Sequence, residues 1–310
     1  MPPVKSSPLR VVVSGASGLI GSRLVKFLAG QGHRVDRLVR RPPPPGSTDI
    51  QWDPAAGQVE AGKLEGADAV VHLSGENIGA ACWTQARKKL ILRSRVESTK
   101  LLAGALAGLK KPPRVLVSAS AIGFYGDGGA EIILEGCPAG QGFLAEVCQA
   151  WEAAAEPARA AGIRVVHPRF GIVLDGEGGA LKAMLIPFRL GLGGPIGSGT
   201  QFMSWIALSD LVRIILHLIQ NENITGPVNA VAPQPVTNAE FSQTLGLVLN
   251  RPALLRVLPS ITRCLFGEMG KALFLGSARV QPGKLAASGF YFLYRDLESA
   301  LRHEIGRLSP

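Results

Sequence analysis

Three glycines near the start of the chain have the spacing of a diphosphate-binding turn. The segment Gly15-Ala16-Ser17-Gly18-Leu19-Ile20-Gly21 follows an apolar run and opens a helical pattern. One glycine lets the chain bend off a strand, another lets backbone N–H groups approach a diphosphate, and the last lets the helix pack on the strand. The helix N-terminus then offers unpaired donors to the anion. The residues predicted to bind the dinucleotide here are Gly15, Ser17, Gly18, Leu19, Ile20 and Gly21.

Two adjacent arginines favour NADP(H) over NAD(H). In the NAD version of this motif, an acidic residue about 20 positions further on binds the ribose hydroxyls, whereas NADP requires a cation for its 2′-phosphate. Arg40 lies 19 residues beyond Gly21, with Arg41 next to it, and Asp36 falls too early to take the acidic role. We therefore predict that Arg40 and Arg41 bind the 2′-phosphate; the alternative is a solvated surface pair.

The positive charge of the chain gathers where this cofactor is predicted. The net charge is +10, and residues 1–110 carry 16 Lys+Arg against 8 Asp+Glu, whereas the rest of the chain carries 17 against 15. A local field that attracts an anionic cofactor explains this asymmetry. The first third contains no basic helix interleaved with aromatic residues, so we predict no nucleic-acid partner.

The sequence shows no sign of a membrane helix or a metal site. No apolar stretch reaches the roughly 18–20 residues of a membrane helix, and no cluster of His, Cys, Asp or Glu has metal-ligand spacing. We expect a cytoplasmic protein without metal or membrane contacts. The four cysteines, Cys82, Cys137, Cys148 and Cys264, form no C-x-x-C pair, and we expect mostly buried thiols in a reducing compartment.

Strands and helices alternate along the first half of the chain. Apolar strands are predicted at 10–14, 34–39, 69–73, 114–118 and 164–167, and helices follow at about 19–29, 84–109 and 143–161. This rhythm, with fully apolar strands, is typical of a parallel sheet covered on both faces. The predicted fold class is therefore α/β: a doubly wound parallel sheet of the Rossmann type, with a second, smaller α+β C-terminal lobe.

The alternation loosens beyond Leu174. We predict an NADP-binding domain over residues 9–174, to which residues 205–232 return with a helix and a strand. Residues 175–310 form the predicted substrate lobe, with a glycine-rich stretch at 191–199 and short helices with a small strand or two after Thr237. That stretch either wraps an anionic group of the substrate together with Arg189 or is a plain turn-rich lid.

Motifs along the chain resemble the extended short-chain dehydrogenase/reductase superfamily, which contains the NAD(P)-dependent epimerases and dehydratases. Besides the glycine turn, they are Val70 to Gly75, Ser118-Ala119-Ser120 with Tyr125-Gly126, and Pro168 to Leu174. More narrowly, Gly75 to Ile78, Leu185 to Gly199, Asn229 to Pro233 and Gly276 to Pro282 resemble an uncharacterised epimerase-like subfamily, some of whose members are labelled cell-division inhibitors. Its members end in a C-terminal domain of unknown function.

The resemblance implies a catalytic pair that this chain lacks. Enzymes of the superfamily use a Tyr-x-x-x-Lys helix, in which the lysine lowers the pKa of the tyrosine and the phenol moves a proton. Here the corresponding positions are Leu144 and Cys148, and the superfamily's helix asparagine is replaced by Arg95. Of the usual catalytic residues, only Ser120 is kept.

The remaining candidates follow from these strand-end motifs. Ser120 and Tyr125 are the catalytic candidates, because both hydroxyls follow the fourth strand. Arg95 either contacts the cofactor or an anionic substrate, or forms a surface ion pair with Glu97 or its helical neighbours. We assign Leu73, Ser74, Gly75, Arg95 and Leu174 to the cofactor site. The substrate candidates are Glu76, Asn77 and Arg189, with capping of the next helix as the alternative for Glu76 and Asn77.

Two functions remain open from the sequence. The first is an NADP(H)-dependent reductase or epimerase acting on a small oxygenated substrate without the Tyr-x-x-x-Lys pair. The second is a non-catalytic, NADP(H)-sensing regulatory protein that has kept the cofactor fold.

Overall fold

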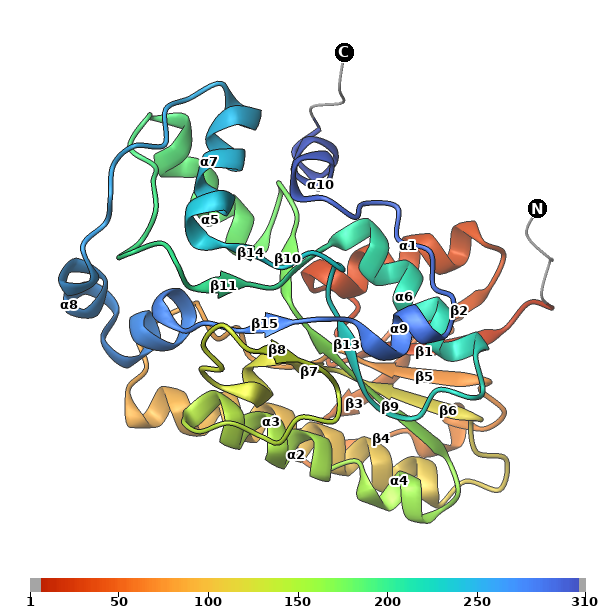
Figure 1. Cartoon of the computed structure of the whole chain (residues 1–310). Helices are drawn as coiled ribbons and strands as arrows, with labels where there is room; N and C mark the ends of the chain where they lie inside the picture. The colour runs from red at the N-terminus through yellow and green to blue at the C-terminus, as the bar shows by residue number, and fades with distance from the viewer. Residues whose placement is uncertain (1–6, 307–310) are drawn as a thin grey trace.

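The centre of the protein is a twisted sheet of nine strands, seen edge-on in Figure 1. The computed structural model describes residues 7–306, apart from the side chains at positions 261, 263 and 265. In spatial order the strands are β13 (Gly226–Ala230), β9 (Arg164–Phe170), β6 (Val115–Ser118), β5 (Ala69–His72), β1 (Arg10–Ser14), β2 (Arg34–Val39), β3 (Ile50–Asp53) and β4 (Gln58–Val59), with the short β7 (Ser120–Ala121) beside β9. All neighbours run parallel except β3 and β4.

Helices cover both faces of this sheet, because successive side chains of a strand point to opposite sides. Val11 and Val13 of β1 pack on one face against α1 (Leu19–Gly30) and α6 (Leu208–Gln220). Val12 packs on the other face with α2 (Gln85–Ala107) and α4 (Glu156–Ala160). Figure 1 shows α2, α3 (Phe143–Ala153) and α4 together below the sheet. The predicted α/β fold class is confirmed.

Several predicted elements differ in their bounds. The helix expected over 143–161 is two helices: α3 ends at Ala153 and α4 begins at Glu156. The fifth strand, β9, continues through Pro168 to Phe170, since β13 pairs with it along that length. β3 and β4 were missed after the proline run, although Ile50 and Trp52 alternate with polar residues as a half-buried strand does.

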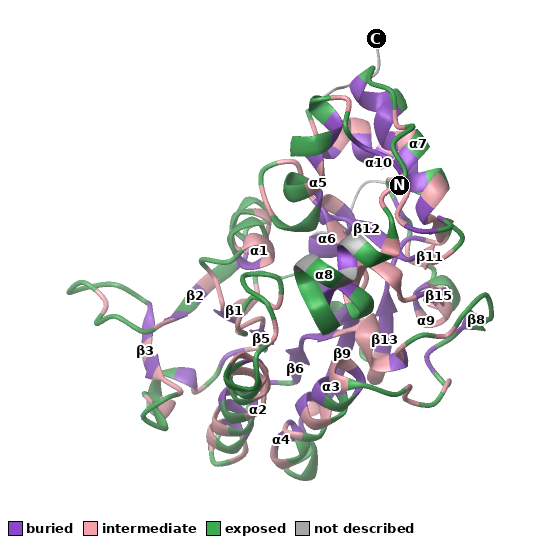
Figure 2. Cartoon of the chain, turned by 90° about the vertical axis from the view of Figure 1, so that its left-hand side faces the viewer, coloured by how far each residue is buried: buried purple, intermediate pink, exposed green. Residues whose placement is uncertain are grey.

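The C-terminal half adds small sheets and helices to this framework. β10 (Ile172–Leu174) pairs with β12 (Trp205–Ala207), β11 (Phe202–Met203) with β14 (Val236–Thr237), and β15 (Arg279–Val280) with β8 (Ile132–Ile133). The helices are α5 (Gly179–Arg189), α7 (Asn238–Leu249), α8 (Pro259–Gly270), α9 (Gly283–Ala287) and α10 (Leu297–Glu304), with a π-helical turn at Lys271–Leu275. Figure 2 shows buried residues continuing from the strands into α7 and α10.

The predicted domain boundary at residue 174 stays a prediction, but the sheet shows how the two halves interlock. β13 lies at the edge of the main sheet and α6 packs against α1, so the segment from 205 to 232 lies with the N-terminal half. Between residues 7 and 306, no helix combines the length and apolar composition that a membrane crossing requires.

A buried carboxylate fastens the C-terminal segment to α6. Asp210, in the first turn of that helix, accepts hydrogen bonds from the backbone amides of Leu293 and Tyr294, both at 2.9 Å, and from Arg213 at 2.8 Å. Its side chain is fully buried. Because the amides would lose their acceptor, removing the carboxylate leaves polar groups without partners inside the protein.

We predict that Asp210→Ala lowers the free energy of unfolding by about 3 kcal/mol, since it breaks charge-assisted hydrogen bonds in a buried position. Urea unfolding followed by circular dichroism measures this change. Glu298→Ala is the matched control, because Glu298 pairs with Arg302 at the surface and its loss should cost less than about 1 kcal/mol. Equal losses in the two variants would contradict this role of Asp210.

Candidate functional site

The end of β1 and the end of β5 meet at the predicted turn. Gly15 has a φ of +68°, in the left-handed region that side chains disfavour. A Cβ atom there would lie 2.8 Å from the carbonyl carbon of Leu73 and 2.9 Å from the amide nitrogen of Ser74. Two backbones therefore cross at this point without room for a side chain. β1 and β5 are also the strands between which the order of the sheet reverses, where open α/β sheets bind ligands.

The beginning of α1 packs directly on this turn. A Cβ atom on Gly21 would collide with the carbonyl oxygen of Gly15, and the amide of Gly18 donates to that same oxygen at 3.0 Å. Gly18 offers no side-chain cap, and no acidic residue lies in the first turn. The first amides of α1 are thus left for an anion. This uncapped turn, which has no side chain at positions 15, 18 and 21, fits the diphosphate of a dinucleotide.

Two cations follow the end of β2, and the carboxylate within that strand is already paired. Arg40 and Arg41 follow β2 and are both exposed. Asp36, in the same strand, is buried and accepts from Arg10 at 2.7 Å and Arg34 at 3.2 Å. Burial favours a higher pKa for Asp36, but hydrogen bonds from Arg10, Thr48 and Arg34 outweigh it and hold the pKa below its usual value. Asp36 is therefore unavailable to ribose hydroxyls.

The residues after β5 lie beside the glycine turn, as the predicted cofactor site requires. The amide of Leu73 donates to the hydroxyl of Ser14 at 3.1 Å, and Gly75 is exposed. Leu174, which was predicted for the same cofactor site, lies in a different environment. Its side chain is completely buried in the core, where β10 packs against α5 and α10. The predicted contact of Leu174 with the cofactor stays a prediction.

Arg95 reaches this edge of the sheet from α2. Its guanidinium carbon lies 5.0 Å from the centre of the Trp151 ring, and its Nη1 donates to the carbonyl of Ile91 at 3.2 Å. A Cβ atom on Gly75 would lie 3.3 Å from the same guanidinium carbon. Desolvation by burial lowers the pKa of Arg95 below its usual range. The alternative pairing with Glu97 does not occur, since Glu97 pairs with Arg93 at 2.8 Å.

Glu76 and Asn77 are held by the start of α2. Glu76 forms an ion pair with Arg87 at 3.0 Å, and Arg87 also donates to the carbonyl of Asn77. The side chain of Asn77 accepts from the amide of Gly79 at 2.9 Å. The cap of α2 is Thr84, so neither residue takes the helix-capping role that was the alternative. Their predicted contact with a substrate stays a prediction.

The two catalytic candidates are buried. Ser120 is 1% exposed and its hydroxyl donates to Oε1 of Glu152 at 2.7 Å. Tyr125 is 4% exposed; its hydroxyl donates to Oδ1 of Asn229 at 2.7 Å and accepts from Nη1 of Arg169 at 2.9 Å. Burial raises the pKa of Tyr125 above its usual value. In this arrangement neither hydroxyl is free to give a proton to a substrate.

Arg169 and Glu152 organise that buried network, and sequence reasoning missed both. Nε and Nη2 of Arg169 donate to the two carboxylate oxygens of Glu152 at 2.8 and 2.9 Å. The guanidinium carbon also lies 3.4 Å from the centre of the Phe124 ring. An arginine near the end of a strand that is buried along most of its length was the available signal, because such a charge needs a partner. We call this set of Ser120, Tyr125, Glu152, Arg169 and Asn229 the Arg169 network.

The positions of the missing tyrosine and lysine are filled by apolar packing. Leu144 packs on Gly123, where a Cβ atom would lie 3.1 Å from that of Leu144. The Cys148 thiol donates to the carbonyl of Ala121 at 3.6 Å, and burial raises its pKa to about 11. Cys148 is therefore not a base at neutral pH. The expectation of mostly buried thiols is wrong for Cys82 and Cys264, which are exposed because they lie in a surface turn and on α8.

Arg189 and the glycine-rich stretch belong to a separate part of the C-terminal half. Arg189 is exposed at the end of α5, and its carbonyl accepts from Arg251 at 3.1 Å. The amide of Ile196 donates to Asn238 at 2.7 Å and that of Gly197 to Val257 at 2.8 Å. These amides are already satisfied, which favours the turn-rich alternative over a site that wraps an anion.

The remaining groups do not suggest another kind of centre. His72 lies in β5 between the hydroxyls of Ser14 and Ser98, at 2.6 and 3.1 Å, and burial lowers its pKa to about 3. It is a neutral core histidine at physiological pH. Across residues 7–306, no three His, Cys, Asp or Glu side chains gather as metal ligands.

Comparison with known proteins places this geometry in a family. Residues 11–230 match the NAD dependent epimerase/dehydratase family, and residues 260–304 match a domain of unknown function, DUF1731. The chain belongs to the NAD dependent epimerase/dehydratase family. It is 41% identical over 298 residues to epimerase family protein Mb2239 of Mycobacterium bovis, covering 96% of this chain and 98% of that protein.

Two solved structures of similar proteins share the fold over nearly the whole of this chain. The crystal structure of human epimerase family protein SDR39U1 with NADPH has 37% identity and a TM-score of 0.88, covering 97% of this chain and 100% of that one. A nucleoside-diphosphate sugar epimerase from Corynebacterium glutamicum has 39% identity and a TM-score of 0.80, covering 97% of this chain and 59% of that one.

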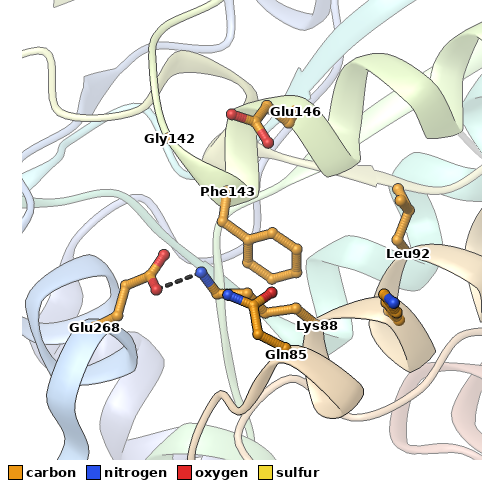
Figure 3. A pocket seen from close by; sticks show the side chains of 8 residues that line it. Gln85, Lys88, Leu92, Gly142, Phe143, Glu146 and Glu268 are labelled. Carbon is orange, nitrogen blue, oxygen red and sulfur yellow. Dashed lines mark ion pairs between the residues drawn. The ribbon is translucent and has the colours of Figure 1, made fainter.

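The DUF1731 region of this epimerase-family chain contacts α2 at a pocket of about 390 Å³. Glu268, on α8, forms an ion pair with Lys88, whose ammonium lies 5.1 Å from the centre of the Phe143 ring. Figure 3 shows Lys88 between Glu268 and Phe143. The C-terminal region thus touches the helix that also carries Arg95.

We predict that native protein at pH 8 reacts with iodoacetamide at Cys82 and Cys264 but not at Cys148, because the Cys148 thiol is buried and stays protonated. Mass spectrometry of the digested protein measures the labelling. Protein unfolded in urea is the control, in which all four cysteines should react. Rapid labelling of native Cys148 would contradict its buried, protonated state.

Proposed function

We propose that this chain binds NADP(H) across the ends of β2, β1 and β5. The observation that carries the proposal is the uncapped cradle at the start of α1, in which Gly15 and Gly21 leave no room for a side chain. Arg40 and Arg41 supply cations for the 2′-phosphate, and the NADPH present in the human SDR39U1 structure supports the same choice. When bound, the cofactor supplies a hydride equivalent.

We propose further that the chain is a reductase or epimerase-like enzyme for a small oxygenated substrate. The substrate site lies at the carboxyl ends of β5 and β6, where Arg95 and Glu76 provide charge. The Arg169 network holds Ser120 and Tyr125 inward, so their part is to fix the wall of this site rather than to donate the proton. Proton transfer through a Tyr-Lys pair is unsupported, since Leu144 and Cys148 fill those positions.

A second candidate function is an NADP(H) sensor without catalysis. The buried, mutually satisfied hydroxyls of Ser120 and Tyr125 favour it, because they leave no free acid next to the cofactor site. Reductase activity and sensing are separated by two measurements, of cofactor oxidation and of partner binding. Protein carrying NADPH is mixed with a panel of carbonyl compounds, and absorbance at the wavelength of NADPH is followed. Oxidation of the cofactor supports the enzyme; an inert cofactor whose redox state controls partner binding supports the sensor.

We predict that Arg40→Asp raises the Kd for NADPH by about 10- to 100-fold and that for NADH by less than about threefold, since one charge-assisted contact to the 2′-phosphate is lost. Fluorescence titration of both cofactors measures the effect. Lys110→Asp is the control, because it changes the net charge equally but lies beyond the end of α2, before β6 begins. Equal weakening of NADPH and NADH by Arg40→Asp would argue against the choice of NADP(H).

A further inference from the structure

An arginine without a carboxylate partner marks the carboxyl end of β5. Arg95 lies on α2, and its guanidinium is against Gly75. Gly75 is exposed and lies three residues after the last residue of β5. In an open α/β sheet, ligands bind at the carboxyl ends of the strands. The position of Arg95 is therefore that of a ligand-binding residue rather than of an outward helix face.

The orientation of this guanidinium is fixed by its neighbours. It stacks on Trp151 of α3 and donates one hydrogen bond, from Nη1 to the carbonyl of Ile91. An arginine has five N–H donors in a planar fork, so most of the fork of Arg95 has no acceptor within the described chain. The unpaired N–H groups of Arg95 are not completely buried, since the completely buried nitrogens without a partner among the described residues belong to Arg87, His167 and Arg279.

The nearby carboxylates are already used. Glu76 pairs with Arg87, and Glu97 pairs with Arg93. In the part of the chain that the structure covers, no carboxylate lies within ion-pairing distance of Arg95. The carboxylate of Glu76 lies close enough to attract Arg95, but it is held by Arg87 and forms no ion pair with Arg95. An anion that contacts this guanidinium directly is therefore favoured.

On this basis, and resting on the proposed function, we propose that Arg95 is the receptor for an anionic group of the substrate, a carboxylate or a phosphate. The planar fork of an arginine binds both groups in bidentate fashion. A substrate of this site then carries an anionic group as well as the oxygen-bearing carbon on which the chemistry takes place.

The sheet order separates this receptor from the anion sites of the dinucleotide. Arg40 follows β2, the diphosphate cradle follows β1, and Arg95 lies over the end of β5 beside α3. Neighbouring strands are about 4.8 Å apart, so the strand end beside Arg95 is one strand from that of the diphosphate cradle and two strands from that of Arg40. Arg95 and Arg40 thus lie over strand ends on opposite sides of the β1 cradle, which leaves Arg95 for a group other than the 2′-phosphate.

The test uses full-length protein, with and without NADPH, and malonate as the anionic probe. Malonamide, which has the same carbon skeleton but no charge, is the matched neutral probe, and inorganic phosphate is the second anion. Calorimetry measures each Kd. We expect malonate to bind at least tenfold more tightly than malonamide, and Arg95→Gln to raise the Kd for malonate at least tenfold while the Kd for NADPH changes less than threefold.

Two further variants separate charge from placement. Arg93→Gln, on the exposed side of the same helix, should leave malonate binding unchanged. Gly75→Ala keeps every charge but adds a methyl group 3.3 Å from the guanidinium carbon, so it should weaken malonate binding as well. Thermal melting and circular dichroism establish that each variant is folded.

Several outcomes would overturn the proposal. They are equal binding of malonate and malonamide, unchanged malonate binding in Arg95→Gln, and a large loss of NADPH affinity in that variant, which would make Arg95 a cofactor contact. Absence of NADPH binding by the unaltered chain defeats the proposed function instead. Charge-selective, Arg95-dependent binding of malonate to the cofactor-free chain would still uphold the receptor.

Discussion

The close crossing of two backbones at Gly15 is the constraint on which the other features depend. β1 can approach the end of β5 only because position 15 has no side chain, and α1 can rest on the same turn only because position 21 has none. Because of this crossing, the first amides of α1 face the carboxyl ends of the strands, and Gly75 lies beside the glycine turn. The cradle for a diphosphate and the surface that receives Arg95 are consequences of one piece of backbone geometry.

Local sequence patterns predicted much of the fold because its main contacts follow local rules. Strand β1 was predicted to the residue, and α2 to within two residues at each end, since apolar runs, glycines and prolines mark their limits. The position of Arg40 after β2 followed from the same reasoning. The break between α3 and α4 was not predictable in this way, because an alanine-rich stretch carries no stop signal.

The state of the catalytic candidates could not be predicted from local patterns. The hydroxyl of Tyr125 bonds to Asn229, which is 104 residues away in the sequence, and that of Ser120 bonds to Glu152, which is 32 residues away. Such partners decide whether a hydroxyl faces a crevice or is satisfied inside the protein. Arg169 was overlooked for the same reason, since its importance comes from three side chains contributed by other elements. Motif spacing places a residue near a site but does not determine its hydrogen bonds.

Two stacked cations connect α2 and α3 along their length. Lys88 lies over Phe143 and Arg95 over Trp151, so cations seven residues apart on one helix meet aromatic rings eight residues apart on the other. Sliding either helix by one turn, about 5.4 Å, would separate both pairs at once. The two contacts therefore set the register of α2 relative to α3. As a result, the distance from Arg95 to the strand ends is fixed by helix packing before any ligand binds.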